Sequence, residues 1–317
     1  MRLDEDSAKL LAWRREINAP FFQDLTPVEA RAAMTAARVA ANVAPPAVKE
    51  VRDHSIVAPG RAIAARRYAP DSTADDKPGP ALIFFHGGGW VIGDLESHDI
   101  LCRQIANEYG GVVIAIEYRL APESCFPAAV EDAEAATAWV FAHAAELGID
   151  PSRVAVGGDS AGGNLAAVVA LLARDRRLPP LAFQALLYPC TDLTLSRGSY
   201  DVAADGLPVT AATMTWFRDH YLAAEEQQVD WRASPLFAPS LRGVAPAYIV
   251  TAGFDPLADE GDAYVRRLRR SGVSVVHRHY PGQIHGFMTM GAMLPTAGQA
   301  IGELGVALRS SLSGARQ

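Results

Sequence analysis

The chain has 317 residues, half of them hydrophobic, which suffices for one large α/β domain or two smaller ones. Its formal net charge of −7 argues against nucleic-acid binding, because that function needs a basic face. The three cysteines are widely spaced, so neither a disulfide framework nor a thiolate zinc site is expected. The charged N-terminus has no apolar signal segment and no apolar run approaches about 18 residues, so we expect a cytoplasmic protein without a membrane span.

The first 45 residues predict helices and show no strand pattern. The stretch TPVE at 26–29 is a capping box, in which the first and last residues exchange hydrogen bonds at the start of a helix. The alanine-rich helix that follows is expected to stop at Pro45–Pro46. Two short alternating runs, at 48–57 and 61–68, then predict a β-hairpin.

From residue 81 onward, apolar strands alternate with helices. After a polar linker at 70–80, strands are expected at 81–85, 112–118, 153–157, 182–188, 247–253 and 273–280. The expected helices are 96–109, 127–147, 161–174, 257–271 and 293–313. Continuous apolar strands separated by helices indicate a mainly parallel sheet with helices on both faces.

The segment 191–240 interrupts this alternation. It contains one helix-like piece at about 208–224, between loops rich in Asp, Ser, Pro and Ala. Because it lies between two strands of the sheet, we expect it to join the helical N-terminus in a lid over the sheet's carboxyl edge. The predicted organisation is a helical cap part at 1–47, a core at 48–190 and 241–317, and a cap insertion at 191–240.

The stretch GGDSAGGN at 157–164 places a serine among glycines where a strand becomes a helix. In the pattern GxSxG the serine occupies a sharp strand-to-helix turn, and Gly158 and Gly162 give Ser160 the room that this turn needs. The helix N-terminus also favours developing negative charge. A phosphate loop or a plain turn is the alternative, but GxxxxGK[ST] is absent and Ile92 stands where GxGxxG needs glycine.

A serine hydroxyl becomes an effective nucleophile when a base accepts its proton and a carboxylate orients that base. In an open parallel sheet these groups lie just beyond the carboxyl ends of strands. Asp255 follows the strand at 247–253, and His285 lies five residues beyond the last predicted strand. The order Ser160, Asp255, His285 is that of the α/β-hydrolases.

The other candidates fit a catalytic role less well. Several histidines lie inside predicted helices or strands, among them His54, His143, His220, His277 and His279. Asp259 and Glu260 are interpreted as the N-terminal charges of the following helix.

Attack on an ester carbonyl also creates an oxyanion, which needs preorganised N–H donors. The stretch HGGGW at 86–90 follows a strand directly, and its glycines let the backbone approach a substrate closely. Ala161, the residue after the serine, offers a further N–H. His86 is interpreted as a support for this loop rather than as a proton carrier.

Five motifs together resemble the bacterial hormone-sensitive-lipase family of esterases: HGGGW (86–90), YRLAPE (118–123), GDSAGG (158–163), DPLADEG (255–261) and HGF (285–287). The resemblance covers roughly residues 50–290. It implies an α/β-hydrolase fold with an eight-stranded sheet and a helical cap. It also implies Ser160 as nucleophile, His285 as general base and acid, and Asp255 as its orienting residue. The oxyanion donors that it implies are Gly88, Gly89 and Ala161.

Members of this family commonly hydrolyse short- to medium-chain acyl esters without a metal or organic cofactor. Many dimerise through the final strand edge, here 273–280. The resemblance therefore implies a serine carboxylesterase that acts on a small-molecule ester through an acyl-enzyme. Two alternatives remain: an amidase, lactone hydrolase or lyase with the same triad, and a small-molecule receptor. Plant gibberellin receptors resemble the family but lack the catalytic histidine, whereas His285 is present here.

The cap is the part that the resemblance constrains least, and its geometry decides which ester fits. Four large side chains are candidates for lining an acyl pocket: Trp90, Met214, Trp216 and Phe217. Core packing is the alternative for each of them, because such side chains at helical spacing usually belong to a core.

Overall fold

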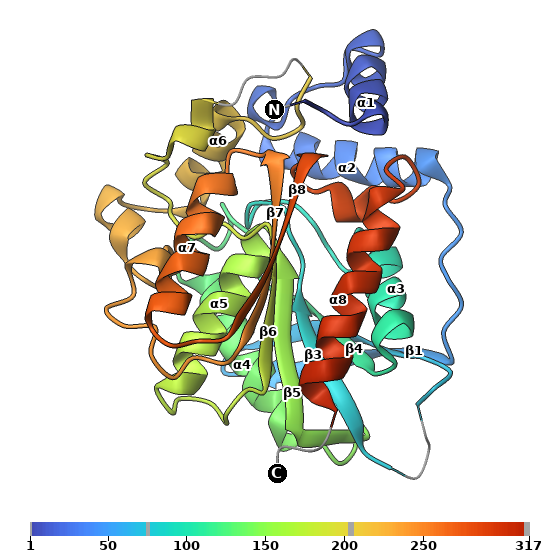
Figure 1. The fold of residues 1–317 in the computed structure, drawn as a ribbon, viewed down its shortest axis with the longest axis vertical. Coiled ribbons are helices and arrows are strands. Elements are labelled where there is room, and N and C mark those ends of the chain that lie inside the picture. Colours follow the sequence, from blue (N-terminus) through green and yellow to red (C-terminus); the bar gives the residue numbers. More distant parts are fainter. Residues whose placement is uncertain (1, 74–76, 202–205, 314–317) are drawn as a thin grey trace.

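Eight strands form one sheet in the order β1-β2-β4-β3-β5-β6-β7-β8 in the computed structural model, which describes residues 2–73, 77–201 and 206–313 (Figure 1). The strands are β1 Glu50–Ala58, β2 Arg61–Ala69, β3 Gly79–Phe85, β4 Val112–Glu117, β5 Ile149–Asp159, β6 Phe183–Leu187, β7 Ala247–Phe254 and β8 Val275–Ile284. β1 and β2 form the predicted antiparallel hairpin, and β2 also pairs antiparallel with β4. All other neighbours are parallel, so the expected mainly parallel sheet is confirmed.

Helices cover both faces of the sheet, with α4, α5 and α7 on one side and α3 and α8 on the other (Figure 1). Their bounds are α3 Asp99–Tyr109, α4 Ala128–Ala142, α5 Ala161–Arg174, α7 Ala258–Arg270 and α8 Thr296–Leu312. Successive side chains of a strand point to opposite faces, so Ile83 and Phe85 of β3 join one apolar core while Leu82 and Phe84 join the other. Among the helices of the described ranges, none has the length and apolar character that a membrane span needs.

Several predicted elements have shifted ends. β5 starts at Ile149 rather than at 153, and α4 ends at Ala142 rather than at 147. β8 runs to Ile284 rather than to 280, because its register against β7 shifts and the edge strand continues through Pro281. Parts of the predicted linker (74–76) and insertion (202–205), and both chain ends (1 and 314–317), lie outside the described residues.

The N-terminal helices and the segment between β6 and β7 lie together at the carboxyl end of the sheet (Figure 1). This end carries α1 Glu5–Glu16, α2 Pro27–Ala41 and α6 Ala211–Tyr221. Thr213 of α6 donates a 2.7 Å hydrogen bond to Gln23, and the rings of Phe217 and Phe22 lie 5.8 Å apart. Two segments distant in the sequence therefore pack into one layer.

The start of α2 and its first turn bind this layer to the loops above the sheet. The expected capping box is present, with reciprocal hydrogen bonds between Thr26 and Glu29. Arg31 donates to the carbonyl of Val91 at 2.8 Å and pairs with Glu123 at 2.7 Å. α2 is thus held both by its own cap and by contacts with the loop after β3.

A buried carboxylate joins the hairpin to the helical layer. Asp132 of α4 is fully buried and accepts hydrogen bonds from the guanidinium groups of Arg61 (2.5 Å) and Arg119 (2.9 Å). Arg61 begins β2 and Arg119 follows β4, so three elements meet at one charge. A buried carboxylate without such partners is strongly unfavourable.

Replacement of Asp132 by Asn should lower the free energy of unfolding by about 2 kcal/mol, because the neutral amide loses charge-assisted hydrogen bonds. Urea denaturation followed by circular dichroism measures the change. Glu131→Gln is a matched control on the same helix, since its carboxylate also pairs with Arg119 but is exposed. It should change stability by less than about 0.5 kcal/mol. Equal midpoints for wild type and Asp132→Asn would contradict this role.

Candidate active site

Ser160 stands at the turn between β5 and α5. Its backbone angles, φ +54° and ψ −115°, lie in a region that favours glycine and that costs energy for other residues. Phe85 at the end of β3 pairs with Gly158, and a Cβ on either Gly158 or Gly162 would collide with the Phe85 carbonyl. Both glycines are therefore needed for β3 to approach this turn.

The structure brings the predicted serine, histidine and aspartate together. Ser160 Oγ lies 2.9 Å from His285 Nε2, and His285 Nδ1 lies 2.8 Å from Asp255 Oδ2. All three are buried, and the Leu257 N–H donates to the other oxygen of Asp255 at 2.8 Å. A carboxylate only accepts, so it keeps the proton on Nδ1 and leaves Nε2 free to accept the serine proton.

The strand order explains why these three residues meet. Ser160 follows β5, Asp255 follows β7 and His285 follows β8, all at the carboxyl end of the sheet. His285 comes directly after β8 rather than five residues beyond the strand, because β8 is longer than predicted. The buried Tyr188 ring packs against the imidazole in an edge-type arrangement, with ring centroids 5.0 Å apart. This contact restricts rotation of the imidazole.

Three N–H groups beside Ser160 have no hydrogen-bond partner within the described part of the chain. They are those of Gly88, Gly89 and Ala161, the predicted oxyanion donors. Gly88 and Gly89 have φ of +116° and +58°, which favour glycine. The ring of Phe217 occupies the space that a side chain on Gly89 would need.

The N–H groups of Gly88 and Gly89 are oriented by the carbonyl group of the same peptide unit. The Gly87 carbonyl accepts a 2.8 Å hydrogen bond from His86 Nδ1, and the Gly88 carbonyl accepts one of 2.9 Å from the Ile92 N–H. In a trans peptide the N–H and C=O groups point in opposite directions. Holding each carbonyl therefore fixes the direction of the N–H that follows it.

His86 is suited to this supporting role. Burial lowers the pKa of His86 to about 4, and the neighbouring His98 adds to that effect, so the ring is neutral near pH 7. The ring stacks on Tyr118 with centroids 4.2 Å apart. These contacts agree with the interpretation of His86 as a support for the loop.

Two further residues of the site, Asp159 and His98, were not predicted from the sequence. Asp159 Oδ1 accepts a 2.8 Å hydrogen bond from the Gly87 N–H and lies 3.0 Å from His98 Nε2. Burial alone would raise the pKa of Asp159, but His98, His86 and the Gly87 N–H together hold that pKa below its usual range. An acid directly before the serine and a histidine after the glycine-rich loop were the available signals.

Glu260 is a second carboxyl group buried near the site. It lies in the first turn of α7, as expected, but it is fully buried and accepts hydrogen bonds from the backbone N–H of Thr191 (2.6 Å) and from the Tyr200 hydroxyl (3.0 Å). Burial raises the pKa of Glu260 to about 8. The charge of nearby Asp192 also raises this pKa, whereas the hydrogen bonds donated to Glu260 lower it. These hydrogen bonds connect the segment after β6 to the start of α7.

The candidates for an acyl pocket have different environments. Trp90 is fully buried and stacks on Tyr221 with centroids 4.2 Å apart, which places it in the core. Phe217 lies directly over the glycine-rich loop, against Gly89. Met214 and Trp216 share α6 with Phe217.

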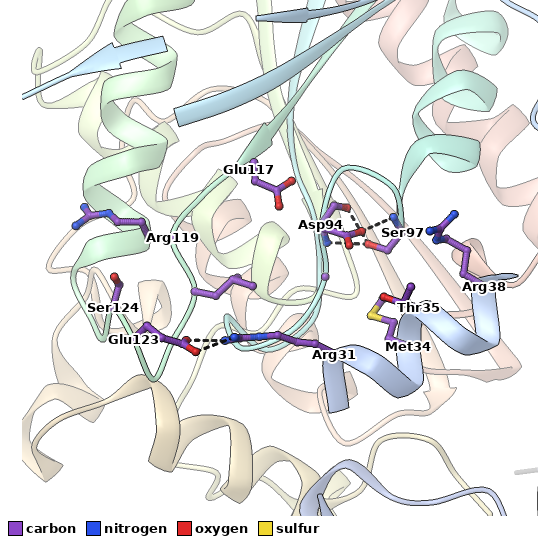
Figure 2. Close-up of a pocket in the computed structure, with 12 residues that line it drawn as sticks. Arg31, Met34, Thr35, Arg38, Asp94, Ser97, Glu117, Arg119, Glu123 and Ser124 are labelled. Atoms are coloured by element: carbon purple, nitrogen blue, oxygen red, sulfur yellow. Dashed lines mark hydrogen bonds and ion pairs between the residues drawn. The ribbon is translucent and has the colours of Figure 1, made fainter. Parts of the chain in front are cut away.

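A cavity of about 400 Å³ lies next to the glycine-rich loop, between α2 and the segments that follow β3 and β4 (Figure 2). Much of its polar lining is already paired, Arg31 with Glu123 and Asp94 with Ser97. Gly93, one of the lining residues, lies against this loop, since a Cβ there would meet the Gly87 carbonyl. Ser160 is not among the residues that line this cavity.

Comparisons with known proteins agree with this geometry. Residues 82–289 match the model of the α/β-hydrolase fold family. The chain belongs to this family. This α/β-hydrolase is 46% identical over 270 residues to the carboxylic ester hydrolase LipN of Mycobacterium tuberculosis, covering 83% of this chain and 71% of LipN. It is 40% identical over 243 residues to an ethyl acetate hydrolase of Pseudomonas putida, covering 76% of each chain.

Solved structures give the same result for the α/β-hydrolase. A thermostable esterase from Pseudomonas putida matches with a TM-score of 0.93 and 37% identity, covering 98% of both chains. An ester hydrolase from the metagenome of Lake Arreo, complexed with a derivative of bipyridine phosphonate, matches with a TM-score of 0.93 and 38% identity, covering 97% of this chain and 98% of that one. The α/β-hydrolase fold, the hormone-sensitive-lipase-like branch and the assignment as a carboxylesterase are confirmed.

The strained backbone at Ser160 predicts a difference in stability between two variants of this residue. Ser160→Gly should raise the free energy of unfolding by about 1 kcal/mol relative to Ser160→Ala, because glycine adopts this backbone without strain. Both variants lose the hydroxyl, so only the backbone preference differs between them. Urea denaturation compares the two. Equal stability of the two variants would mean that the turn is not strained.

The pKa of Glu260 predicts a pH dependence of stability. It is about 8 in the folded chain and 4.5 as the ordinary value, so the unfolded chain releases this proton first as the pH rises. The stability that protonated Glu260 gives to the folded chain is therefore complete below about pH 4.5 and is lost as the pH rises through about 8. In Glu260→Gln, urea titrations should therefore give an unfolding free energy that falls less between these pH values than in wild type. The exposed Glu226→Gln should follow the wild-type curve.

Proposed function

We propose that this carboxylesterase hydrolyses short- to medium-chain acyl esters through an acyl-enzyme on Ser160. The observation that carries the proposal is the hydrogen-bonded chain from Ser160 Oγ through His285 to Asp255, beside the three oxyanion donors. The relative named for ethyl acetate hydrolysis supports a small acyl group in the substrate. Because His285 is present and bonded to the serine, this proposal is favoured over a receptor function.

In the proposed mechanism His285 Nε2 accepts the proton of Ser160 as Oγ attacks the ester carbonyl carbon. The oxyanion donors receive the negative charge on the carbonyl oxygen. Collapse of this intermediate transfers the proton from His285 to the departing alcohol and leaves the acyl group on Ser160. Water, deprotonated by His285, then attacks the acyl carbon and releases the acid. Asp255 keeps Nδ1 protonated and stabilises the imidazolium in both steps.

We propose that residues 1–47 and 191–240 form a cap that selects the acyl group above the core at 48–190 and 241–317. The packing of η1 (Phe22–Asp24) against α6 and the position of Phe217 over the glycine-rich loop support this division. Such a cap would exclude bulk water from the oxyanion site, which strengthens its hydrogen bonds.

Further proposals concern the setting in which the enzyme works. The mechanism as written needs neither a metal nor an organic cofactor. Three free cysteines, Cys102, Cys125 and Cys190, support a cytoplasmic location, since a reducing compartment preserves thiols. β8 is the last strand of the sheet, and its open edge at 273–280 is the proposed contact of a homodimer.

Wild type should hydrolyse p-nitrophenyl acetate and butyrate with an initial burst of p-nitrophenol, because acylation releases the alcohol before water releases the acid. Ser160→Ala should lower turnover by about 10⁶, since the triad acts as a unit. Ser152→Ala, at the exposed far end of β5, is the matched control and should retain full activity. Turnover that survives in Ser160→Ala would refute the nucleophile, and a wild type inactive on every ester would favour the amidase or lyase alternative.

A further inference from the structure

We propose that Asp159, held by His98, is a positioning residue that fixes the oxyanion donors relative to Ser160. The inference rests on the proposed function, because it concerns the same oxyanion site. It assigns a role to a buried pair of side chains that the triad mechanism does not use.

That peptide, between His86 and Gly87, is held at both ends. Its N–H donates to Asp159 Oδ1 at 2.8 Å, and its carbonyl accepts from the Tyr118 hydroxyl at 2.7 Å. The following peptide carries the Gly88 N–H. A rotation of the first peptide would turn the Gly88 N–H away from the substrate oxygen. The hydrogen bond from Gly87 to Asp159 therefore limits how far the direction of the Gly88 N–H can vary.

The acceptor is also part of the segment that carries the nucleophile. Asp159 directly precedes Ser160, whose N–H is itself bonded to the Leu187 carbonyl at 2.8 Å. The hydrogen bond from Gly87 therefore joins the glycine-rich loop to the backbone of the nucleophile. It sets the distance between the attacking oxygen and the donors, which no single side chain of the triad controls.

His98 keeps the carboxylate in this position. A carboxylate only accepts, so in the 3.0 Å contact with Asp159 we assign the proton to His98 Nε2. The Gly87 N–H lies 3.3 Å from the same nitrogen, so the peptide faces both side chains of the pair. The other ring nitrogen lies 2.9 Å from the Ser97 hydroxyl, which accepts from the Asp94 N–H. Ser97 and Asp94 line the cavity of Figure 2, so the hydrogen-bonded chain runs from that cavity to Gly87. Asp159 and His98 are only 4% and 3% exposed, so bulk solvent does not compete for this contact.

Asp159→Asn tests the proposal because it keeps the shape of the side chain but removes its charge. With p-nitrophenyl butyrate, kcat should fall roughly 10- to 100-fold while KM stays nearly unchanged, because the donors act on charge that exists only in the transition state. The rate of inactivation by a p-nitrophenyl phosphonate ester should fall by the same factor as kcat/KM, since that adduct also places an anionic oxygen on the donors.

His98→Gln should lower kcat by a smaller factor, and it should cause no further fall in the Asp159→Asn background, because His98 acts through Asp159. Asp132→Asn is the control for a purely structural effect. It also loses a buried carboxylate but should keep the wild-type kcat, because Asp132 touches neither the loop nor the triad.

A wild-type kcat in folded Asp159→Asn, or a change confined to KM, would overturn the proposal. If the double variant loses kcat by the product of the two single-variant factors, the two residues act independently, and that result would overturn the role of His98. If circular dichroism shows that Asp159→Asn does not fold, the test uses His98→Gln instead. A lowered kcat with an unchanged KM supports the proposal, and a wild-type kcat overturns it. Failure of the proposed function appears separately, as an absent p-nitrophenol burst in wild type, whereas these outcomes compare variants of an active enzyme.

Discussion

The close approach between the end of β3 and the turn after β5 is the constraint on which the site depends. The Phe85 carbonyl occupies the space where side chains on Gly158 and Gly162 would lie. This contact places the glycine-rich loop, which begins at the next residue, beside the nucleophile. It also leaves Ser160 as the residue of the turn that bears the strained backbone. Moving the two strands apart to relieve the strain would also separate the Ser160 hydroxyl from the proposed oxyanion donors.

The parallel sheet completes the site with residues that are far apart in the sequence. β5, β6, β7 and β8 are neighbours in chain order, and parallel strands present their carboxyl ends at one edge. The pairing of these parallel strands is therefore enough to bring Asp255 and His285 close to Ser160. The extra length of β8 shortens the loop before His285, which leaves the imidazole less freedom than a five-residue loop would give it.

Features that depend on local spacing could be predicted from the sequence. The capping box of α2, the β1–β2 hairpin and the apolar strands all follow from neighbouring residues, and the triad follows from its place after strands. The extension of β8 through Pro281 was not predictable, because it depends on a register shift against β7. Glu260 was placed correctly in the first turn of α7, but its burial depends on the packing of Thr191 and Tyr200 against it.

Asp159 and His98 were missed for the same reason, and their arrangement solves an electrostatic problem. A carboxylate directly before the nucleophile would repel the oxyanion, and the repulsion is strong where water is excluded. Glu260 is also fully buried and lies near the charge of Asp192. Its pKa rises to about 8, so it is mostly protonated near neutral pH. Asp159 instead has a histidine and a backbone N–H as donors, and its pKa falls. Its charge is therefore retained and is partly offset by the Gly87 N–H and by His98. A carboxylate bound in this way can anchor the loop while opposing the oxyanion less than an unpaired one would.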